Sequence, residues 1–407
     1  MKSFKILKKQ IFVMIVVSLA LFACKNKNTV EATSNKNETS IKYDMQVVDN
    51  DDETVKISDV TIERDSKFGC VNVCKTKDEF TNDGFDLGDS VDVMFSNGYA
   101  LYDIPYYNGF YVNTGDLLVL AYPDAQWVAV IESNGDSLWD YAKLDTTDTV
   151  TIELREKGKY KNIQESLDLG KYSSDRNDYP SDEAFVNFRN VKVGKLKENI
   201  LYRGASPINN LHGRAKYADR LIKDVDIKYD IDLSDSDDEI KKNIESNDFD
   251  SEHFKSLYDT GKVAALSMNV NYRSEEFSKK VAKAMTDMAR SEGANYVHCV
   301  EGKDRTGFVL MVAEGLAGAT YDEIVDDYMI TYENYYGVNK INNKEKYDAI
   351  KNVYIDGMLK IVSNMVDSNN DKVALKDIDF ESVMRKYLTM NGMTEEDIEA
   401  WNKKFIK

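Results

Sequence analysis

Cys299 and Arg305 are separated by five residues in the C-terminal half of this 407-residue chain. A cysteine thiolate can attack phosphorus, and the planar guanidinium of an arginine can bind two oxygens of one phosphate group. Gly302 lies between them, where the missing side chain lets the backbone come close to a bound group. This spacing therefore indicates a loop that holds a phosphate and presents a nucleophile to it.

The sequence on both sides of this loop predicts how it is held. Residues 295–298 are a short β-prone run, and residues 308–317 are almost wholly apolar and are followed by Gly318. A helix that is apolar on all sides is a buried one, and glycine commonly ends a helix. We expect a strand, a tight loop and a central helix, so that the loop N–H groups and the helix N-terminus converge on one anion.

The residues of the loop have distinct expected roles. Cys299 lies beside a helix N-terminus, which favours its thiolate form at neutral pH. We expect Thr306 to donate its hydroxyl to the sulfur, and His298 to orient the loop through hydrogen bonds and not to act as a base. The residues predicted to surround the phosphate are Val300, Glu301, Gly302, Lys303, Asp304 and Arg305.

Residues 298–307 read His-Cys-Val-Glu-Gly-Lys-Asp-Arg-Thr-Gly, and this stretch resembles the signature of the cysteine-dependent protein tyrosine phosphatases. The Gly-Lys-Asp-Arg-Thr-Gly form resembles the bacterial branch that includes secreted mycobacterial and listerial enzymes with mixed phosphotyrosine and phosphoinositide activity. The resemblance implies a thiophosphate intermediate on Cys299, its hydrolysis by water, and no metal or other cofactor. It extends over residues 184–407 through segments at 187–190, 201–206, 229–233 and 322–328.

Such an enzyme needs a general acid to protonate the leaving oxygen. The family carries this aspartate on a loop that corresponds to residues 262–273, which contain no Asp or Glu. Asp304 is our first candidate, with the alternative that its carboxylate only holds Lys303 or Arg305 in place. Asp232 is the second, although an aspartate in a strand is more often structural. A nearby acidic run has the pattern of a solvated face and is given little weight: Asp235, Asp237 and Asp238.

The charge of the loop bears on the substrate. Its two acidic residues formally balance its two basic residues, and Glu301 stands where the family commonly has a small residue. A neutral loop favours a monophosphate such as phosphotyrosine over a multiply phosphorylated inositol. The alternative is that Glu301 points to solvent and carries no information. Arg203 is expected either to reach a substrate phosphate or, the reading we favour, to pair with the acidic surface.

The first residues have the pattern of a bacterial lipoprotein signal. A lysine-rich start precedes an apolar run at residues 11–23, which is shorter than the roughly 20 residues of a spanning helix. The run ends Leu-Phe-Ala and is followed by Cys24, which is then the lipidated residue; an ordinary cleaved signal or an uncleaved anchor is the alternative. We expect residues 1–23 to be the signal peptide and residues 24–44 a disordered tether. Acyl chains would hold the protein on the extracytoplasmic face of the membrane.

Composition excludes several classes of protein. The formal net charge is −18, so a general basic surface for nucleic acid is excluded and the lipid, not charge, must hold the chain to a membrane. The three histidines do not cluster, so no metal site is expected. Cys70 and Cys74 lie too far apart for a disulfide if the segment is extended, but a turn there would permit one.

Residues 45–156 have the pattern of an all-β domain. Asn-Gly and Thr-Gly pairs separate aromatic and β-branched runs, as in hairpins. We predict a small antiparallel barrel or sandwich, joined by a linker at residues 157–183 to the next domain. No sequence feature identifies its partner. The expected strands are residues 91–95, 99–102, 110–112, 117–122 and 127–132.

Residues 184–407 are expected to form an α/β phosphatase domain with a mainly parallel central sheet flanked by helices. Ser274 is suited to cap one helix, and Thr320 with Glu323 forms a capping box for another. The site is then expected at the C-terminal ends of the strands. Further helices are expected at residues 380–388 and 395–404.

These features together predict a metal-independent phosphatase that hydrolyses phosphate monoesters, with phosphotyrosine on proteins as the favoured substrate. One alternative is a phosphoinositide or small phosphate ester phosphatase, for which lipid head groups would be the better substrates. A second is a phosphate-binding pseudophosphatase, which would bind phosphopeptides without turnover. A third is an adhesion lipoprotein, whose surface binding would survive deletion of residues 184–407.

Overall fold

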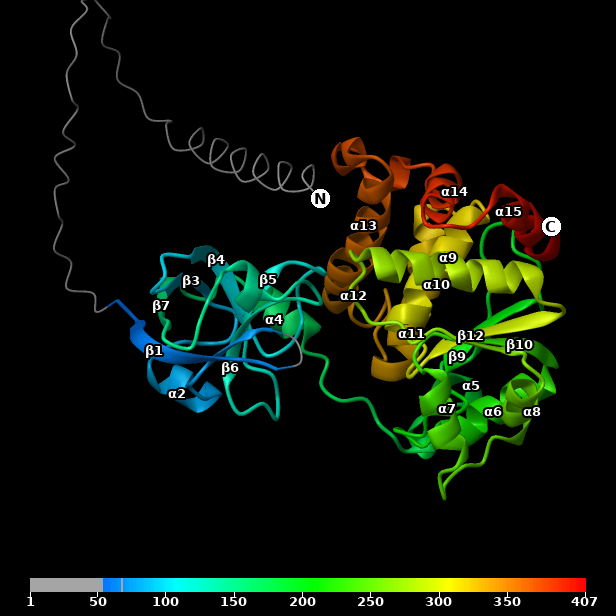
Figure 1. Cartoon of the computed structure of the whole chain (residues 1–407), viewed down its shortest axis with the longest axis horizontal. Coiled ribbons are helices and arrows are strands. Elements are labelled where there is room, and N and C mark those ends of the chain that lie inside the picture. The colour runs from blue at the N-terminus through cyan, green and yellow to red at the C-terminus, as the bar shows by residue number, and fades with distance from the viewer. Residues whose placement is uncertain (1–53, 67–68) are drawn as a thin grey trace, which may run out of the picture. The chain divides into compact units, whose positions relative to one another are not determined.

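The computed structural model describes residues 54–66 and 69–407. The predicted signal peptide, Cys24 and the predicted tether lie outside these residues and are drawn as a grey trace in Figure 1. Within the described part of the chain, no helix is both long and apolar enough to cross a membrane.

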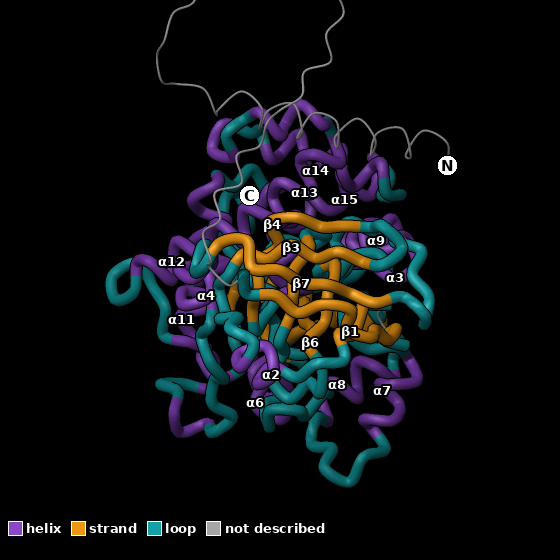
Figure 2. The backbone as a smooth tube through the Cα atoms, turned by 90° about the vertical axis from the view of Figure 1, so that its left-hand side faces the viewer, coloured by secondary structure: helices purple, strands orange, loops and turns teal. Residues whose placement is uncertain are grey.

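Seven strands form a closed barrel in the N-terminal part of the described chain (Figures 1 and 2). Neighbours around the barrel follow the order β1-β2-β6-β5-β4-β3-β7, and β7 pairs with β1 to close it. A barrel is one of the two predicted architectures. The strands are β1 (Lys56–Arg64), β2 (Val71–Val73), β3 (Ser90–Phe95), β4 (Ala100–Tyr107), β5 (Leu117–Leu120), β6 (Val128–Glu132) and β7 (Thr149–Glu156).

Three details of the predicted β domain are wrong. Strands β4 and β5 are parallel, with Tyr106 opposite Val119, so the barrel is not wholly antiparallel. Two short helices, α2 (Lys77–Asn82) and α3 (Leu138–Tyr141), interrupt the strands, so the domain is not all-β. Residues 110–112 are not a strand and lie in the connection from β4 to β5.

The Asn-Gly pairs have different roles in the barrel. Asn97-Gly98 forms the turn of the β3–β4 hairpin, where Phe95 N–H donates to the carbonyl of Tyr99 at 2.8 Å and Gly98 has a φ of +89°. The pair at residues 108–109 instead begins the β4–β5 connection, because two parallel strands cannot be joined by a two-residue turn. This connection, residues 108–116, is named the barrel loop below.

Cys70 and Cys74 flank strand β2 and are free thiols. The extended backbone between them places them too far apart for a disulfide. Burial raises the pKa of the Cys70 thiol to about 11, with the charge of Asp65 acting in the same direction, so this thiol stays protonated at neutral pH.

A five-stranded sheet forms the centre of the C-terminal part, in the order β11-β10-β12-β9-β8. Four strands are parallel, and the two-residue edge strand β8 runs antiparallel to β9. Helices connect the parallel strands in sequence, as such connections require. The strands are β8 (Arg189–Asn190), β9 (Leu201–Ala205), β10 (Ile227–Asp232), β11 (Val263–Ala265) and β12 (Ala294–Cys299).

Helices cover both faces of this sheet (Figure 1). Val297 of β12 belongs to the hydrophobic core on one face, and Tyr296 belongs to the core on the other. The first core is completed by α9 (Glu275–Arg290), α10 (Asp304–Leu316), α11 (Tyr321–Tyr336), α13 (Asp356–Val366), α14 (Phe380–Met390) and α15 (Glu395–Phe405). The second is completed by α5 (Asp182–Phe185), α6 (Ala215–Asp224), α7 (Asp237–Ile244) and α8 (Glu252–Asp259).

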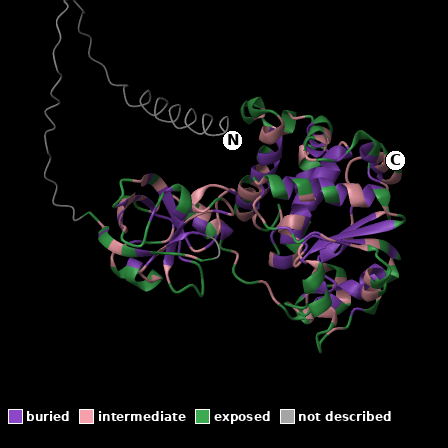
Figure 3. Ribbon diagram, in the orientation of Figure 1, coloured by how far each residue is buried: buried purple, intermediate pink, exposed green. Residues whose placement is uncertain are grey.

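Local sequence signals set the ends of several helices. Ser274 caps α9 by accepting the N–H of Phe277, and Thr320 with Glu323 forms the predicted capping box of α11. Helix α10 is buried on all sides, as its composition predicts (Figure 3), but it begins at Asp304, four residues before the predicted start. Helix α12 (Lys344–Ile350) and the π-helical turn η2 (Lys351–Ile355) before α13 were not predicted.

The segment predicted as a linker, residues 157–183, is not a free connection. It contains α4 (Lys161–Leu167), which packs against α12. Leu167 is buried in the first core of the sheet, and Tyr172 stacks on Tyr335 with ring centroids 4.8 Å apart. These apolar contacts anchor the segment on the sheet domain. The segment is polar on average, so its composition did not indicate this anchoring.

Arg214 joins this segment to the sheet domain. Its side chain is buried, its Nε donates to the carbonyl of Phe185 at 2.7 Å, and one Nη donates to the carbonyl of Ser173 at 3.1 Å. The guanidinium also lies over the rings of Tyr172 and Tyr335, at 4.8 and 5.0 Å from their centroids. A buried cation that is held by carbonyls and aromatic faces is sensitive to the loss of either.

We expect Arg214→Met to lower the free energy of unfolding by about 2–4 kcal/mol, because it leaves the buried Phe185 carbonyl without its side-chain donor and removes the cation from the rings of Tyr172 and Tyr335. Urea denaturation of the two proteins measures the difference. Arg220→Met, on the same helix but 54% exposed, is the matched control and should change stability by less than about 1 kcal/mol. Equal effects of the two changes would contradict the anchoring role of Arg214.

Candidate active site

Cys299 is the last residue of β12, at the C-terminal edge of the sheet. Strands β9 and β10 flank β12, and Cys299 lies opposite Ala205 of β9. Its side chain is 3% exposed. Residues 300–303 lead directly from this thiol into helix α10, so the predicted strand, loop and helix are present in that order.

Carbonyl groups of three successive loop residues are hydrogen-bonded to groups outside the loop. The backbone N–H of Ser206 donates to the carbonyl of Val300 at 3.1 Å. The hydroxyl of Tyr335 donates to the carbonyl of Glu301 at 2.6 Å. Gly302 is the third of these residues.

The carbonyl of Gly302 accepts two hydrogen bonds, one from Arg203 Nη2 and one from Asn187 Nδ2, each at 3.0 Å. Gly302 has a φ of +67°, and a Cβ atom there would overlap the carbonyl of Gly204. Both the backbone conformation and the close approach require glycine at this position.

The N–H groups of the loop are left for a ligand. In a peptide unit the C=O and the following N–H point in opposite directions, so the outward carbonyls of residues 300–302 turn the N–H groups of residues 301–303 inward. These three N–H groups donate no hydrogen bond to the part of the chain that the structure describes. With the N-terminus of α10 they form a concave set of donors suited to an anion.

Arg203 does not lie on the acidic surface, and the surface ion pair expected for it is wrong. Its side chain is 1% exposed, and Nη1 lies 2.8 Å from Asp327 of α11. Arg189 binds the same carboxylate at 3.0 Å. Burial acts to raise the pKa of Asp327, but the charges of Arg189 and Arg203 outweigh it and hold the pKa below its usual range. Arg203 therefore supports the loop from behind.

Arg305 is half-buried, and its Nη1 donates to the carbonyl of Met268 at 3.0 Å. Met268 belongs to residues 262–273, the stretch that contains no Asp or Glu. This stretch therefore holds the catalytic-loop arginine through a backbone carbonyl and supplies no general acid. Thr306 departs from expectation: its hydroxyl is buried in the first turn of α10 and bonds to no described residue, so the predicted bond to the sulfur of Cys299 is not formed.

His298 is fully buried, and its Nε2 lies 2.9 Å from Asp230 Oδ1. Burial acts to lower the pKa of His298, but the charges of Asp230 and Asp232 outweigh it and raise the pKa to about 10. The imidazole is therefore protonated at neutral pH and cannot accept a further proton. It is a buried cation next to Cys299 in the sequence.

Asp232 lies opposite His298 in the sheet and closes the turn after β10. Its Oδ1 accepts the N–H of Ser234 at 2.9 Å and the N–H of Asp235 at 3.0 Å. The side chain is fully buried. This geometry gives Asp232 the structural role that we favoured over acid catalysis.

Asp235 differs from the exposed acidic residues that follow it. It is 6% exposed, and burial together with the charge of Asp232 raises the pKa of its carboxyl to about 7. Its carbonyl accepts the N–H of Ser267 at 3.2 Å, next to the residue that holds Arg305. Ser236 caps α7, which places Asp235 before the helix. That capping pattern is the sequence signal that separates it from a solvated run.

Asp304 opens helix α10, and its side chain is 47% exposed. Lys303 Nζ lies 3.8 Å from its Oδ2. Desolvation raises the pKa of Asp304, with the charge of Glu301 in the same direction and that of Lys303 against them. Asp304 was expected either to act as the general acid or only to hold Lys303 or Arg305. It lies beside Lys303, and its raised pKa means that its carboxyl holds a proton more readily than usual.

Glu301 does not point into open solvent. Its Oε2 lies 3.4 Å from Lys303 Nζ, and its Oε1 accepts the hydroxyl of Tyr172. Burial acts to raise the pKa of Glu301, but Lys303 and Tyr172 lower it overall. Burial acts to lower the pKa of Lys303, but Asp304 and Glu301 hold it well above its usual value. The lysine is charged, and two carboxylates balance it.

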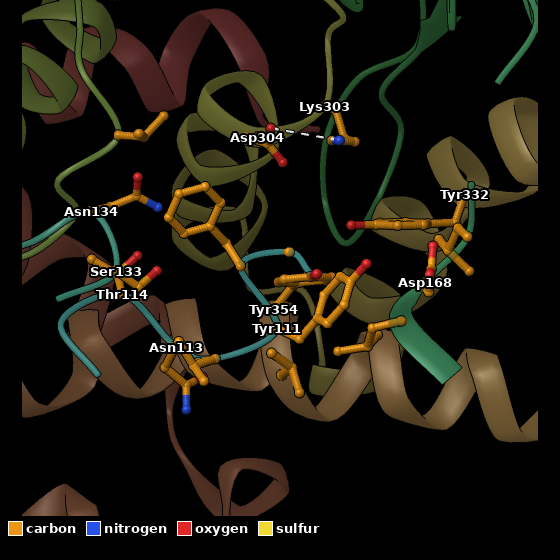
Figure 4. Close-up of a pocket in the computed structure, with 18 of the residues that line it drawn as sticks. Tyr111, Asn113, Thr114, Ser133, Asn134, Asp168, Lys303, Asp304, Tyr332 and Tyr354 are labelled. Atoms are coloured by element: carbon orange, nitrogen blue, oxygen red, sulfur yellow. Dashed lines mark ion pairs between the residues drawn. The ribbon is translucent and has the colours of Figure 1, made fainter. Parts of the chain in front are cut away.

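A cavity of about 680 Å³ opens beside the loop at Lys303 and Asp304 (Figure 4). Neither Cys299 nor Arg305 lines it. Tyr272, which lines the cavity, is 8% exposed and lies against Phe308 of α10 with ring centroids 4.9 Å apart. The cavity therefore adjoins the anion-binding loop and does not contain it.

The described residues contain no cluster of His, Cys, Asp and Glu that could hold a metal ion. In a comparison with known families, a model described as "Tyrosine phosphatase family" matches residues 183–407, more than half of the chain. No curated protein matches the chain.

We expect the free energy of unfolding to fall as the pH rises from 7 to 9. Between about pH 6.5 and 10 native His298 keeps a proton that the unfolded chain has lost, so its contribution is full below that window and disappears as the pH rises through it. Asp230→Asn removes the main stabilising charge and should flatten the slope, which approaches about 1.4 kcal/mol per pH unit for one proton.

Urea denaturation at several pH values tests this expectation. Asp226→Asn is the matched control, because Asp226 precedes the same strand but is 74% exposed. If the slope of the Asp230→Asn variant equals that of the control, the His298–Asp230 pair does not govern the pH dependence.

Proposed function

We propose that this chain, which belongs to the tyrosine phosphatase family, hydrolyses phosphate monoesters through a covalent intermediate on Cys299. The observation that carries the proposal is the loop itself. Its carbonyls are bonded outward, its free N–H groups face inward, and it lies between a buried thiol and the N-terminus of a buried helix.

In the first step the thiolate of Cys299 attacks phosphorus. A sulfur–phosphorus bond forms, the bond to the leaving oxygen breaks, and a general acid protonates that oxygen. The inward N–H groups of the loop and the guanidinium of Arg305 stabilise the charge on the other three oxygens. The hydrogen bond from the Arg305 guanidinium to the Met268 carbonyl fixes the guanidinium before the substrate arrives.

In the second step water attacks the thiophosphate, which releases inorganic phosphate and restores the thiolate. The residue that gave its proton to the leaving oxygen is then a carboxylate and can take a proton from this water. The protonated His298, bound to Asp230, does not exchange protons in either step and orients the loop.

Asp304 is our candidate for the general acid. It is the first residue of α10 and directly precedes Arg305, and its carboxyl has a raised pKa. Asp235 is the second candidate, because its carboxyl has a pKa of about 7 and its backbone contacts the stretch that holds Arg305. Asp232 is not proposed, since backbone donors already bind its carboxylate.

Phosphotyrosine on proteins is the proposed substrate. Lys303, which is suited to bind an additional phosphate, is paired with Glu301 at 3.4 Å. This balance favours a monophosphate over a multiply phosphorylated inositol. Attachment of the enzyme to a membrane through Cys24 stays a prediction, because Cys24 lies outside the described residues.

We expect residues 45–407 to turn over p-nitrophenyl phosphate in the presence of EDTA and a reductant, and Cys299→Ser to abolish this turnover. The reductant keeps the thiol reduced, and the chelator separates a thiol mechanism from a metal-dependent one. Cys74→Ser, at a free thiol of the barrel, is the control and should retain activity. No turnover by the unmutated protein would leave a phosphate-binding pseudophosphatase as the better account.

We expect Asp304→Asn to lower kcat/KM about 100-fold or more for phenyl phosphate, and much less for p-nitrophenyl phosphate. A poor leaving group needs the proton of the acid, whereas p-nitrophenolate leaves without it. Asp237→Asn, in the exposed acidic run, is the matched control. If Asp235→Asn shows this dependence on the leaving group and Asp304→Asn does not, the assignment passes to Asp235.

A further inference from the structure

We propose that the barrel loop, residues 108–116, forms one wall of a substrate subsite beside the phosphate loop. This subsite takes an aromatic or aliphatic side chain that flanks the phosphotyrosine of a peptide. The inference rests on the proposed function, and it assigns to the β-barrel a part in substrate selection.

The barrel loop contacts the catalytic domain at two points. Asn113 lies against Gly357 of α13 so closely that a Cβ atom on Gly357 would overlap its Oδ1. Arg273, which precedes α9, lies 3.6 Å from Asp116. The contact of the Asn113 side chain with the backbone of α13 and the ion pair at Asp116 therefore hold the second half of the barrel loop against the domain that carries Cys299.

Tyr111 is the main aromatic side chain of this wall. It lies against Tyr107 of β4 with ring centroids 5.6 Å apart, and it packs against the core of the catalytic domain. Gly109 permits this placement, because a Cβ atom there would meet the Tyr111 ring. Figure 4 shows Tyr111 next to Tyr354, which comes from the catalytic domain.

The opposite wall is a row of stacked tyrosines. Tyr332 lies nearly parallel to Tyr354, with ring centroids 6.2 Å apart and an interplanar angle of 9°. Tyr332 also stacks on Tyr328 at 6.1 Å and on Tyr336 at 5.7 Å. All four rings line the cavity. Aromatic rings from the barrel loop and from the catalytic domain line the cavity, and such a lining suits a planar or branched apolar side chain.

The end of the cavity meets the reacting group. Lys303 and Asp304 line it, and the next residue is Arg305. Tyr272 lines the same cavity, and its ring centroid lies 4.9 Å from that of Phe308, three residues after Arg305 on α10. A residue next to a phosphotyrosine bound at Cys299 can therefore reach the cavity.

The polar groups of the lining select against other ligands. The charge of Lys303 is balanced by Glu301, so the cavity does not favour a second phosphate. Amide and hydroxyl groups interrupt the apolar surface, which disfavours an acyl chain and suits the backbone of a peptide. The amide and hydroxyl groups belong to Asn108, Asn113, Thr114, Ser133 and Asn134. The cavity volume of about 680 Å³ is within the range of ligand sites.

The charged residues at the rim of the cavity are also paired. Lys171 lies 3.8 Å from Asp124, and both side chains are 88% exposed. Asp168 accepts a hydrogen bond from Asn108 Nδ2 at 2.9 Å. The rim therefore presents no concentrated charge of one sign to a substrate.

The test compares p-nitrophenyl phosphate with two phosphotyrosine peptides, one with leucine and phenylalanine beside the phosphotyrosine and one with glycine. We expect residues 45–407 to prefer the apolar peptide. Tyr111→Ala should lower kcat/KM for that peptide by about tenfold or more and should change the other two substrates by less than about twofold. Tyr111→Phe keeps the ring and should keep the preference.

Tyr102→Ala is the matched control, because Tyr102 lies on β4 but is 62% exposed and outside the cavity. Asn134→Asp is a second variant that serves if Tyr111→Ala does not fold. Asn134 lines the cavity, and the backbone there has a φ of 47°, which Asp adopts as readily as Asn. The added charge should lower kcat/KM for a peptide with acidic flanking residues about tenfold relative to the apolar peptide.

The outcomes separate this inference from the proposed function. Absence of p-nitrophenyl phosphate turnover in the unmutated protein would refute the phosphatase. If the unmutated protein turns over p-nitrophenyl phosphate normally, two results for Tyr111→Ala would refute the subsite alone. One is an unchanged preference between the two peptides, and the other is an equal loss of activity on all substrates. A soluble phosphoinositide is assayed beside them: if Tyr111→Ala lowers its turnover and leaves both peptides unchanged, the ligand is a lipid head group and the assigned peptide is wrong.

Discussion

The conformation of the phosphate loop depends on one carbonyl group, that of Gly302, and on the two donors that bind it. Arg203 and Asn187 hold this carbonyl outward. The carboxylate of Asp327 forms ion pairs with both Arg203 and Arg189. Removing one partner of such a buried group leaves an uncompensated charge. The members come from three segments distant from the loop, at 187–190, 201–206 and 322–328, and each supplies a part of the same support.

A second constraint is electrostatic, and it acts from the opposite side of the loop. The buried cation of His298 lies among the carboxylates of Asp230 and Asp232, and these hold its proton up to a pKa of about 10. Burial and the charge of Asp232 raise the pKa of the Asp235 carboxyl and so favour its neutral form. One cluster thus keeps a histidine charged and an aspartate ready to be protonated, which local sequence alone does not reveal.

The sequence predicted those features that neighbouring residues determine. The strand, loop and apolar helix around Cys299 follow from residues within one short stretch, and so do the caps of α9 and α11. The burial of Asp235 was missed, because it depends on how the turn after β10 packs against residues that follow β11. Strand β1 was missed because a bulge near Asp59, with a φ of 54°, breaks its alternation. The alternation of β7 is regular, and that strand was predictable.

The parallel pairing of β4 and β5 has a consequence beyond the barrel. Parallel neighbours need a long connection, and this connection supplies both Tyr111 to the cavity and Asp116 to Arg273. Arg273 ends the stretch that replaces the acid-bearing loop of the family and that holds Arg305 through Met268. The barrel is therefore tied to the stretch that positions the catalytic arginine. A change at Asp116 acts on the phosphate site through Arg273 and the stretch that ends there, whereas Tyr111 acts on the cavity alone.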